Sequence, residues 1–312
     1  SQEDTNKLRT IGKGCPTFLS EYGQSGTMDL PSVLAQFKRL GQEQSEDARL
    51  FRTLMDGFMA DWTRWRMDEI WKRPEDYFVE GHRSYARIKE PGETALRSNP
   101  ALVAYSPTHT VADRYNGNGL TTNFREPKDP ALFEGARLAY APLRWCLFAT
   151  PDNIYRGSRV RFEVVLADED TLPAGEYPAR VEILGPDRRP IATRDFRITL
   201  GDFAKDHKRA FATPCFSEEI VVDGPAGAYE LVVTMSDGRK IPGDRLTFHV
   251  DDPGTMPALP PEVTLWGEDA ALSGWLTGHG VKVIPFDPLA SKRQIIAVGA
   301  KPPAPGGAEA FA

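Results

Sequence analysis

Hydrophobic and polar positions follow a helical spacing in the first part of the chain. Apolar residues recur at steps of three and four over residues 45–73, which predicts a long helix with Ser45 as its N-cap. Pro74 ends that helix and opens the next. Two short apolar runs, each followed by a polar loop, predict two strands. In order, the region is predicted to contain a strand over residues 17–21, two helices, a strand over residues 101–105 and a helix over residues 130–140.

The hydrophobic period changes to two between about residues 144 and 250. Apolar residues alternate there with polar ones, and turn signals such as Gly185-Pro186-Asp187 separate the runs. The alternating runs are Val160/Phe162/Val164, Val181/Ile183, Phe196/Ile198/Leu200, Tyr229/Leu231/Val233 and Leu246/Phe248/Val250. About seven short strands in roughly a hundred residues are typical of an immunoglobulin-like sandwich. No Cys…Trp…Cys spacing accompanies them, so an antibody domain is excluded.

The last part of the chain returns to alternating strands and helices. Residues 251–261 carry four prolines and predict a linker. Beyond it, strands are predicted over residues 263–266, 281–286 and 294–298, with a helix over residues 270–277. About fifty residues of this kind cannot cover both faces of a parallel sheet, and two strands cannot close a barrel. We therefore expect the chain to be a segment of a longer polypeptide, or to be completed by another chain.

Composition places the chain among ordinary globular proteins. Of 312 residues, 40% are hydrophobic and 26% are charged, which excludes disorder, collagen-like repeats and coiled coil for most of it. The formal net charge of −6 argues against a nucleic-acid or anionic-membrane partner. No run approaches the ~18 apolar residues of a membrane span, and no basic-then-apolar leader is present. Three widely spaced cysteines leave the compartment open.

The sharpest chemical feature is the segment Leu19-Ser20-Glu21-Tyr22-Gly23, which ends the first predicted strand in a carboxylate. In a barrel, the carboxyl ends of the strands carry the active site, so Glu21 is a candidate nucleophile toward an anomeric carbon. Retaining glycosidases need a second carboxylate about 5–5.5 Å away. A strand-end acid that pairs with a neighbouring arginine or caps a loop is the alternative interpretation.

Five residues just beyond the two strand ends are candidate substrate contacts. Tyr22 and Tyr105 offer aromatic faces to the C–H groups of a sugar, and Ser106, Thr108 and His109 offer hydrogen bonds to its oxygens. Packing within loops is the alternative for each of them.

Other chemistries are not supported by the sequence. The five histidines are scattered and form no His-x-His or His-Glu-x-x-His pattern, so no metal site and no cofactor are predicted. No Gly-x-Ser-x-Gly elbow is present. Cys215 is expected to be a core or edge residue of the sandwich. The spacing of Trp62, Trp65 and Trp71 favours helix packing over a carbohydrate platform.

The segment over residues 18–23, Phe-Leu-Ser-Glu-Tyr-Gly, resembles the nucleophile strand of glycoside hydrolase family 2. Residues 99–106 resemble the last barrel strand, and residues 119–126 and 141–148 are similar to segments of bacterial members. The resemblance implies that Glu21 is the nucleophile of a retaining enzyme that hydrolyses terminal β-glycosidic bonds of oligo- or polysaccharides.

The resemblance also implies a fold class, which is multidomain α/β plus β. Residues 1–143 would be the C-terminal part of a TIM (β/α)8 barrel, and residues 144–251 an immunoglobulin-like sandwich. A linker over residues 252–261 would lead to a partial Rossmann-like α/β domain over residues 262–312.

One element of the family pattern is absent. The acid/base glutamate of the family follows an asparagine on an earlier barrel strand, and this sequence contains no Asn-Glu pair. The expected partners are therefore a carbohydrate substrate and the N-terminal barrel and sugar-binding domains of a parent polypeptide, and a homo-oligomer is compatible with the sequence. The alternative is a carbohydrate-binding or structural sandwich protein with a degenerate barrel remnant.

Overall fold

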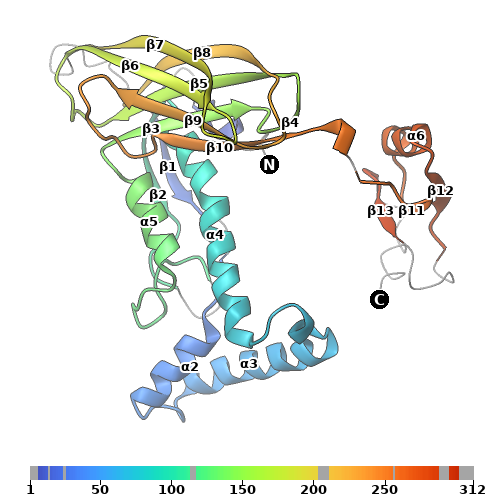
Figure 1. Ribbon diagram of the computed structural model, residues 1–312. Helices are drawn as coiled ribbons and strands as arrows, with labels where there is room; N and C mark the ends of the chain where they lie inside the picture. The colour runs from blue at the N-terminus through green and yellow to red at the C-terminus, as the bar shows by residue number, and fades with distance from the viewer. Residues whose placement is uncertain are drawn as a thin grey trace. The chain divides into compact units, whose positions relative to one another are not determined.

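The computed structural model describes residues 6–12, 15–23, 26–112, 117–202, 211–255, 257–287 and 295–301. These residues belong to two compact units, Ser1–Asp251 and Asp252–Ala312 (Figure 1). No described helix is both long enough and apolar enough to cross a bilayer. Together the described residues form a mixed α/β structure with several separate sheets.

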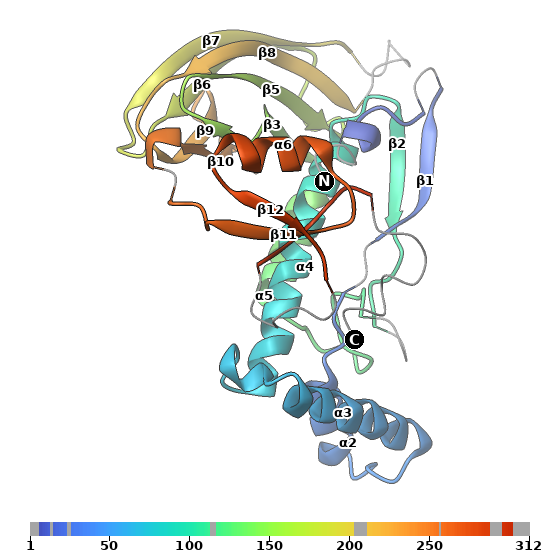
Figure 2. The same ribbon diagram turned by 90° about the vertical axis from the view of Figure 1, so that its right-hand side faces the viewer.

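The first unit begins with a parallel pair of strands and the helices that connect them. Strands β1 (Thr17–Tyr22) and β2 (Leu102–Pro107) lie side by side (Figure 2). Both strands predicted from the sequence are thus confirmed, and each runs one or two residues further than expected. The helical segments of this region are α2 (Leu30–Arg39), α3 (Glu46–Arg64), η1 (Met67–Glu69), α4 (Pro74–Arg97) and α5 (Pro130–Ala139).

Local signals set the starts of these helices correctly. The Ser45 side chain accepts a hydrogen bond from the Ala48 amide, so the predicted N-cap is confirmed, and α4 begins at Pro74 as expected. The predicted end of the long helix is wrong, because α3 stops at Arg64 and Arg66 adopts a left-handed backbone. Beyond that point the apolar Ile70 is 74% exposed and contributes to no core.

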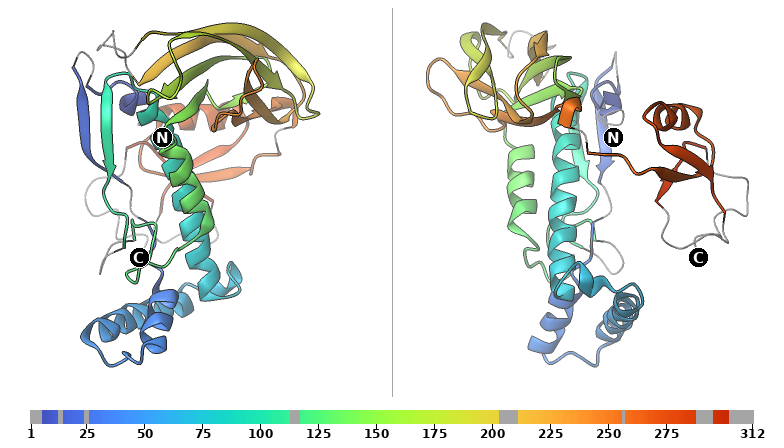
Figure 3. Two further views of the ribbon diagram at one scale, coloured as in Figure 1. Left: turned by 90° about the vertical axis from the view of Figure 1, so that its left-hand side faces the viewer. Right: turned by 45° about the vertical axis from the view of Figure 1, so that its right-hand side comes forward.

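Helix α4 connects two regions of the first unit. At one end it packs with α2 and α3 around Leu30, Val33, Phe51 and Phe78. At the other end it reaches the sandwich, and α5 lies beside it (Figure 3). Of the tryptophans with helical spacing, Trp62 is buried but Trp65 is 64% exposed, so the packing expected of Trp65 is not observed.

The middle of the chain forms two stacked sheets. One sheet has the order β3-β5-β8 and the other β4-β10-β9-β6-β7. Their bounds are β3 (Leu143–Thr150), β4 (Asn153–Tyr155), β5 (Ser158–Asp168), β6 (Gly175–Leu184), β7 (Pro190–Leu200), β8 (Ala212–Val222), β9 (Gly227–Met235) and β10 (Arg245–Asp251). The core between the sheets includes Trp145, Phe162, Tyr229 and Phe248. All five alternating runs of the sequence lie in these strands.

Three strands of the sandwich show no alternation of apolar and polar residues in the sequence, and the structure explains why. Strand β3 is buried on both faces, so its apolar residues do not alternate with polar ones. Strand β8 pairs with β5 across an irregularity between Val164 and Val165, which interrupts its alternation. Strand β4 has only three residues.

The second unit is a small parallel α/β structure. Strand β11 (Glu262–Trp266) pairs in parallel with β12 (Lys282–Pro285) and β13 (Ile296–Val298), and α6 (Ala270–Gly278) follows β11. Val263, Leu276 and Val281 form its core. The predicted strands and helix are confirmed here, although residue 294 of the last predicted strand lies outside the described residues. The linker predicted over residues 252–261 contains the short turn η2 (Pro253–Thr255).

Candidate functional site

Parallel pairing of β1 and β2 brings the predicted site residues to one edge. Leu19 pairs with Tyr105 and Tyr22 with Pro107, so both strands end at the same edge. The Thr108 amide then donates to the Tyr22 carbonyl over 3.0 Å. Glu21 and Ser106 therefore lie near each other in the last residues of the two strands, and Thr108 follows β2. The expectation that all five substrate candidates lie beyond the strand ends is wrong for Tyr22, Tyr105 and Ser106, because both strands run further than predicted.

Glu21 is exposed at this edge. Among the residues that the structure describes, none makes a hydrogen bond or ion pair with its carboxylate. Glu21 also does not line any of the three cavities described below. The carboxylate is accordingly available to solvent and is not neutralised by a described arginine.

The Tyr22 side chain turns toward α4. Its hydroxyl is buried and has no hydrogen-bond partner in the described part of the chain. It lies so close to Gly92 that a Cβ at that position would collide with it. Burial, with the neighbouring charge of Glu93, raises the pKa of Tyr22 to about 12. Tyr22 therefore fixes the contact between β1 and α4.

Tyr105 also packs on the helical side of the pair. Its hydroxyl donates to the Ala139 carbonyl of α5 over 3.3 Å, and its ring stacks on Tyr140 with 5.1 Å between centroids. Burial raises its pKa. The Ser106 hydroxyl makes only a long contact of 3.4 Å with the Pro107 carbonyl, and His109 is half-buried in the loop beyond. Their roles in substrate binding stay predictions.

The loop after β1 and the loop after β2 are hydrogen-bonded to each other. The Gly26 amide donates to Asn118 Oδ1 over 2.9 Å, and the two backbones approach so closely that a side chain at Gly117 would not fit. Lys128 Nζ donates to the Gly117 carbonyl over 2.7 Å, and burial lowers its pKa to about 8. No local sequence signal reveals that residues 117 and 118 meet the loop after β1, because the contact joins positions about ninety residues apart.

His82 of α4 contacts the loop that follows β1. Its Nε2 lies 3.0 Å from the Thr27 carbonyl, the side chain is buried, and burial lowers its pKa. Sequence reasoning missed His82 and Lys128, because neither belongs to a recognisable motif.

A buried ion pair lies on α4 beside Tyr22. Lys89 and Glu93 are four residues apart, and their side chains are only 8% and 2% exposed. Burial raises the pKa of Glu93 although Lys89 and Arg144 act in the opposite direction. Arg144 in turn donates to Thr94 over 3.0 Å. Sequence patterns place charges at a helix surface, so this cluster was not predicted.

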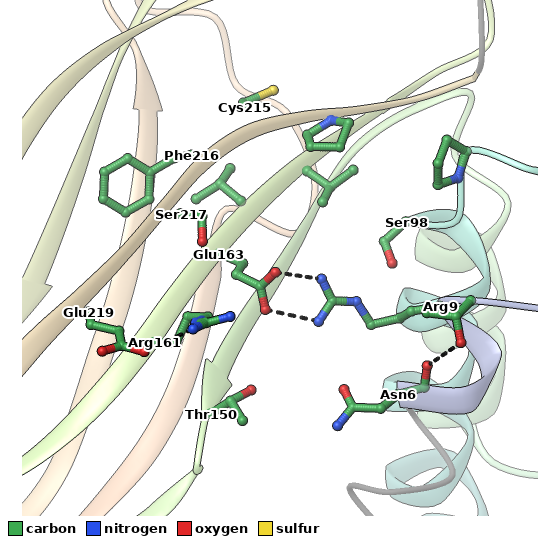
Figure 4. A pocket seen from close by; sticks show the side chains of 15 residues that line it. Asn6, Arg9, Ser98, Thr150, Arg161, Glu163, Cys215, Phe216, Ser217 and Glu219 are labelled. Carbon is green, nitrogen blue, oxygen red and sulfur yellow. Dashed lines mark hydrogen bonds and ion pairs between the residues drawn. The ribbon is translucent and has the colours of Figure 1, made fainter. Parts of the chain in front are cut away.

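A cavity of about 850 Å³, here called the junction cavity, lies between the N-terminal turn (residues 6–12), the end of α4 and the outer face of β5 and β8 (Figure 4). Arg9 of the turn donates two bonds to Glu163, at 3.0 and 2.9 Å, and its guanidinium lies 3.9 Å from the ring centre of Phe148. Asn99 anchors the same turn through the carbonyls of residues 8 and 11. A second cavity of about 710 Å³ follows α4 and β3, and a third of about 410 Å³ lies by Tyr105.

Metal-ligating side chains do not gather in the described part of the chain. No three or more His, Cys, Asp or Glu residues lie there in a position to hold an ion. Cys215 is half-buried, and its thiol donates to the Thr213 carbonyl over 2.9 Å. As expected, it belongs to the sandwich.

Comparisons with known proteins give no family assignment. No family model and no curated protein matches the chain. An alkylpurine DNA glycosylase of Pseudomonas fluorescens bound to DNA with an abasic site analogue is 17% identical over 39% of this chain and 38% of its own, with a TM-score of 0.26. A glycosyl hydrolase family 2 member from Bacteroides cellulosilyticus is also 17% identical, over 35% of this chain and 14% of its own, with a TM-score of 0.26.

A third solved structure is the CARDB domain of a Pyrococcus furiosus protein in complex with di-metal ions. It is 14% identical over 35% of this chain and 91% of its own, with a TM-score of 0.24. The chain thus spans less than two fifths of the glycosylase and about a seventh of the glycosyl hydrolase. Likenesses with these TM-scores carry no conclusion about function.

Proposed function

We propose that the chain is the C-terminal segment of a retaining β-glycosidase that hydrolyses terminal β-glycosidic bonds of oligo- or polysaccharides. One observation carries the proposal: Glu21 presents an exposed carboxylate, without a described ion partner, at the edge where two parallel strands end. This edge is where a barrel holds its catalytic groups. The alternative of an acid paired with a neighbouring arginine finds no support among the described residues.

In this mechanism the Glu21 carboxylate attacks the anomeric carbon and forms a glycosyl ester, while the second residue, as a protonated carboxylic acid, donates its proton to the departing glycosidic oxygen. The second residue, now a carboxylate, then removes a proton from water as the water oxygen bonds to the anomeric carbon, which releases the sugar and frees the Glu21 carboxylate. We place that acid/base on a part of the barrel outside this chain. Exposed apolar side chains on the strand pair support a missing part of the barrel. Phe18 and Val103 are 60% and 49% exposed, whereas a parallel sheet is normally covered on both faces.

The test uses the polypeptide that carries the remaining barrel strands. It is incubated separately with activated 2-deoxy-2-fluoro β-galactoside, β-glucoside, β-mannoside and β-glucuronide, and the adduct is mapped by peptide mass spectrometry. We expect one reagent to label Glu21. A Glu21→Gln variant should fold normally, since the residue is exposed, yet lose labelling and turnover, because an amide is not an anionic nucleophile. Labelling of another residue would remove the assignment.

A second candidate is a non-catalytic carbohydrate-binding or structural protein. Two observations favour it: Glu21 lines none of the described cavities, and Tyr22 and Tyr105 direct their hydroxyls toward helices. This candidate predicts no adduct with any of the four reagents and no hydrolysis by the complete polypeptide.

A further inference from the structure

The junction cavity is a site of ligand size away from the residues proposed for catalysis. Its volume of about 850 Å³ falls within the range of roughly 300–1,000 Å³ typical of small-molecule sites. One wall is the outer face of β5 and β8, and the other is formed by the N-terminal turn and the end of α4 (Figure 4). Segments far apart in the sequence therefore build it together.

Strand register concentrates hydrogen-bonding groups on the sandwich wall. Arg161 pairs across the strands with Glu219, and Glu163 with Ser217, so all four side chains lie on one face. Arg161 donates to Glu219 over 2.9 Å. From the opposite wall, Arg9 reaches Glu163 with two bonds (Figure 4). Donors and acceptors thus alternate around the cavity.

The charges of the lining balance. Among the described residues that line the cavity, Arg9 is paired with Glu163 and Arg161 with Glu219, so these four side chains offer no unpaired charge to phosphate or a metal cation. Hydrogen-bonding capacity nevertheless remains. The described bond to Glu219 uses one of the five N–H groups of Arg161, and a carboxylate has about four acceptor positions. Asn6, Thr150 and Ser217 add neutral polar groups.

We infer that the junction cavity binds a neutral polyhydroxylated ligand, namely an uncharged mono- or disaccharide. Each sugar hydroxyl both donates and accepts, so it fits a lining in which guanidinium and carboxylate groups alternate. The rings of Pro100 and Pro214 supply apolar surface for the C–H groups of the sugar. No residue of β1 or β2 is among the described residues that line this cavity, so binding there does not depend on Glu21.

The cavity serves binding and not chemistry. Cys215, the one thiol among its described lining residues, donates a hydrogen bond to the Thr213 carbonyl, and burial raises its pKa to about 12, so it stays protonated at neutral pH. The Glu163 carboxylate is occupied by Arg9, which lowers its pKa.

The test titrates the full chain with cellobiose, lactose, maltose and mannobiose in turn, by calorimetry and by saturation-transfer NMR. Inorganic phosphate and glucuronate serve as charged competitors. We expect at least one disaccharide to bind saturably and neither anion to displace it. Arg161→Ala should weaken binding about tenfold, since a hydrogen bond from a charged group is lost. Ser217→Trp should abolish binding by filling the cavity; Ser217 is exposed, so the fold tolerates the change.

Two controls locate the site. Arg180→Ala removes a similar cross-strand pair with Asp195 that lines none of the described cavities, and it should leave binding unchanged. Glu21→Gln should also leave it unchanged. The inference is overturned if no disaccharide saturates, if an anion displaces the sugar, or if binding survives in Ser217→Trp but is lost in Glu21→Gln. The last outcome would place the sugar at the strand edge.

Discussion

The sandwich and the β1–β2 pair solve the burial of apolar side chains differently. In the sandwich, two facing sheets enclose their own core, and Phe162 and Phe248 are almost completely buried between them. In the β1–β2 pair, helices pack on one side while Phe18 and Val103 stay largely in solvent. The same residue type is thus a core residue in one region and a surface residue in the other. The sandwich needs nothing further to close its core, whereas the parallel pair has uncovered apolar surface.

The largest expected effect separates these two phenylalanines. Phe162→Ala should lower the free energy of unfolding by about 4 kcal/mol, because it opens a cavity beside Phe248. Phe18→Ala should change it by less than about 0.5 kcal/mol, since the ring is 60% exposed. Urea unfolding of the full chain, followed by far-UV circular dichroism, measures both.

Equal losses in the two variants would break the comparison, because they would mean that Phe18 is covered in solution. Binding of a hydrophobic dye gives a second readout. Phe18→Ser should reduce dye binding by the folded chain if the exposed face of β1 attracts the dye.

The second prediction concerns how each region holds its charges. The sandwich keeps ion pairs such as Arg180–Asp195 in solvent, whereas α4 buries Lys89 and Glu93. Lys89→Met leaves a buried carboxyl without its partner and should cost about 3 kcal/mol at pH 7.5. The double variant Lys89→Met/Glu93→Leu should recover most of that loss, since an apolar pair of similar size is tolerated.

The pH dependence of the Lys89→Met variant follows from the raised pKa of Glu93. A carboxyl with a raised pKa in the folded state contributes stability that is complete below its unfolded pKa of about 4.3 and is lost as pH rises through the folded pKa. Removing Lys89 raises that pKa further. The loss in free energy of unfolding caused by Lys89→Met should therefore be small near pH 4.5 and grow toward pH 7.5. A deficit that does not change with pH would show that Glu93 is not the cause.

The sequence predicted those features that local signals set. The Ser45 cap, Pro74 and the alternating runs of the sandwich each act within a few residues, and they gave the correct element starts. The pattern failed at Trp65 and Ile70, because helical spacing continues there without a core to face. It also failed at β3, where burial on both faces removes alternation.

Within the candidate site, the sequence correctly placed Glu21 at the end of a strand. It did not predict which way the neighbouring side chains point. Tyr22 packs on Gly92, seventy positions away in the chain, and only the fold brings the two together. The buried pair Lys89–Glu93 has the spacing of an ordinary surface pair. Long-range contacts of this kind have no local signature.

The third prediction tests the junction between the two regions. Arg9→Met removes two bonds to Glu163 at a site where both side chains are less than a quarter exposed, and it should cost about 1–2 kcal/mol at pH 7. Arg161→Met is the control, because its pair with Glu219 is half exposed and should contribute no measurable stability. Thermal unfolding compares them.

The loss in Arg9→Met should depend on pH in the direction opposite to that of Lys89→Met. Arg9 lowers the pKa of Glu163, so the pair contributes stability above the unfolded pKa of about 4.3 and loses it as pH falls through the folded value. Wild type and variant should therefore converge in acid. If the difference in stability between wild type and Arg9→Met were as large at pH 3 as at pH 7, the loss would come from the contact between Arg9 and the Phe148 ring.

The smallest expected effect compares two buried tyrosine hydroxyls. Tyr229 in the sandwich donates to the Pro225 carbonyl over 2.8 Å, so Tyr229→Phe should cost about 1 kcal/mol. The hydroxyl of Tyr22 has no partner in the described part of the chain, and Tyr22→Phe should therefore leave the free energy of unfolding unchanged or raise it by up to about 1 kcal/mol. Both substitutions delete the same atom, so the difference in urea midpoints reports the hydrogen bond alone. A loss in Tyr22→Phe as large as that in Tyr229→Phe would mean that the Tyr22 hydroxyl is satisfied in solution, and the strand that carries Glu21 would then be held to α4 by a polar contact and not by packing.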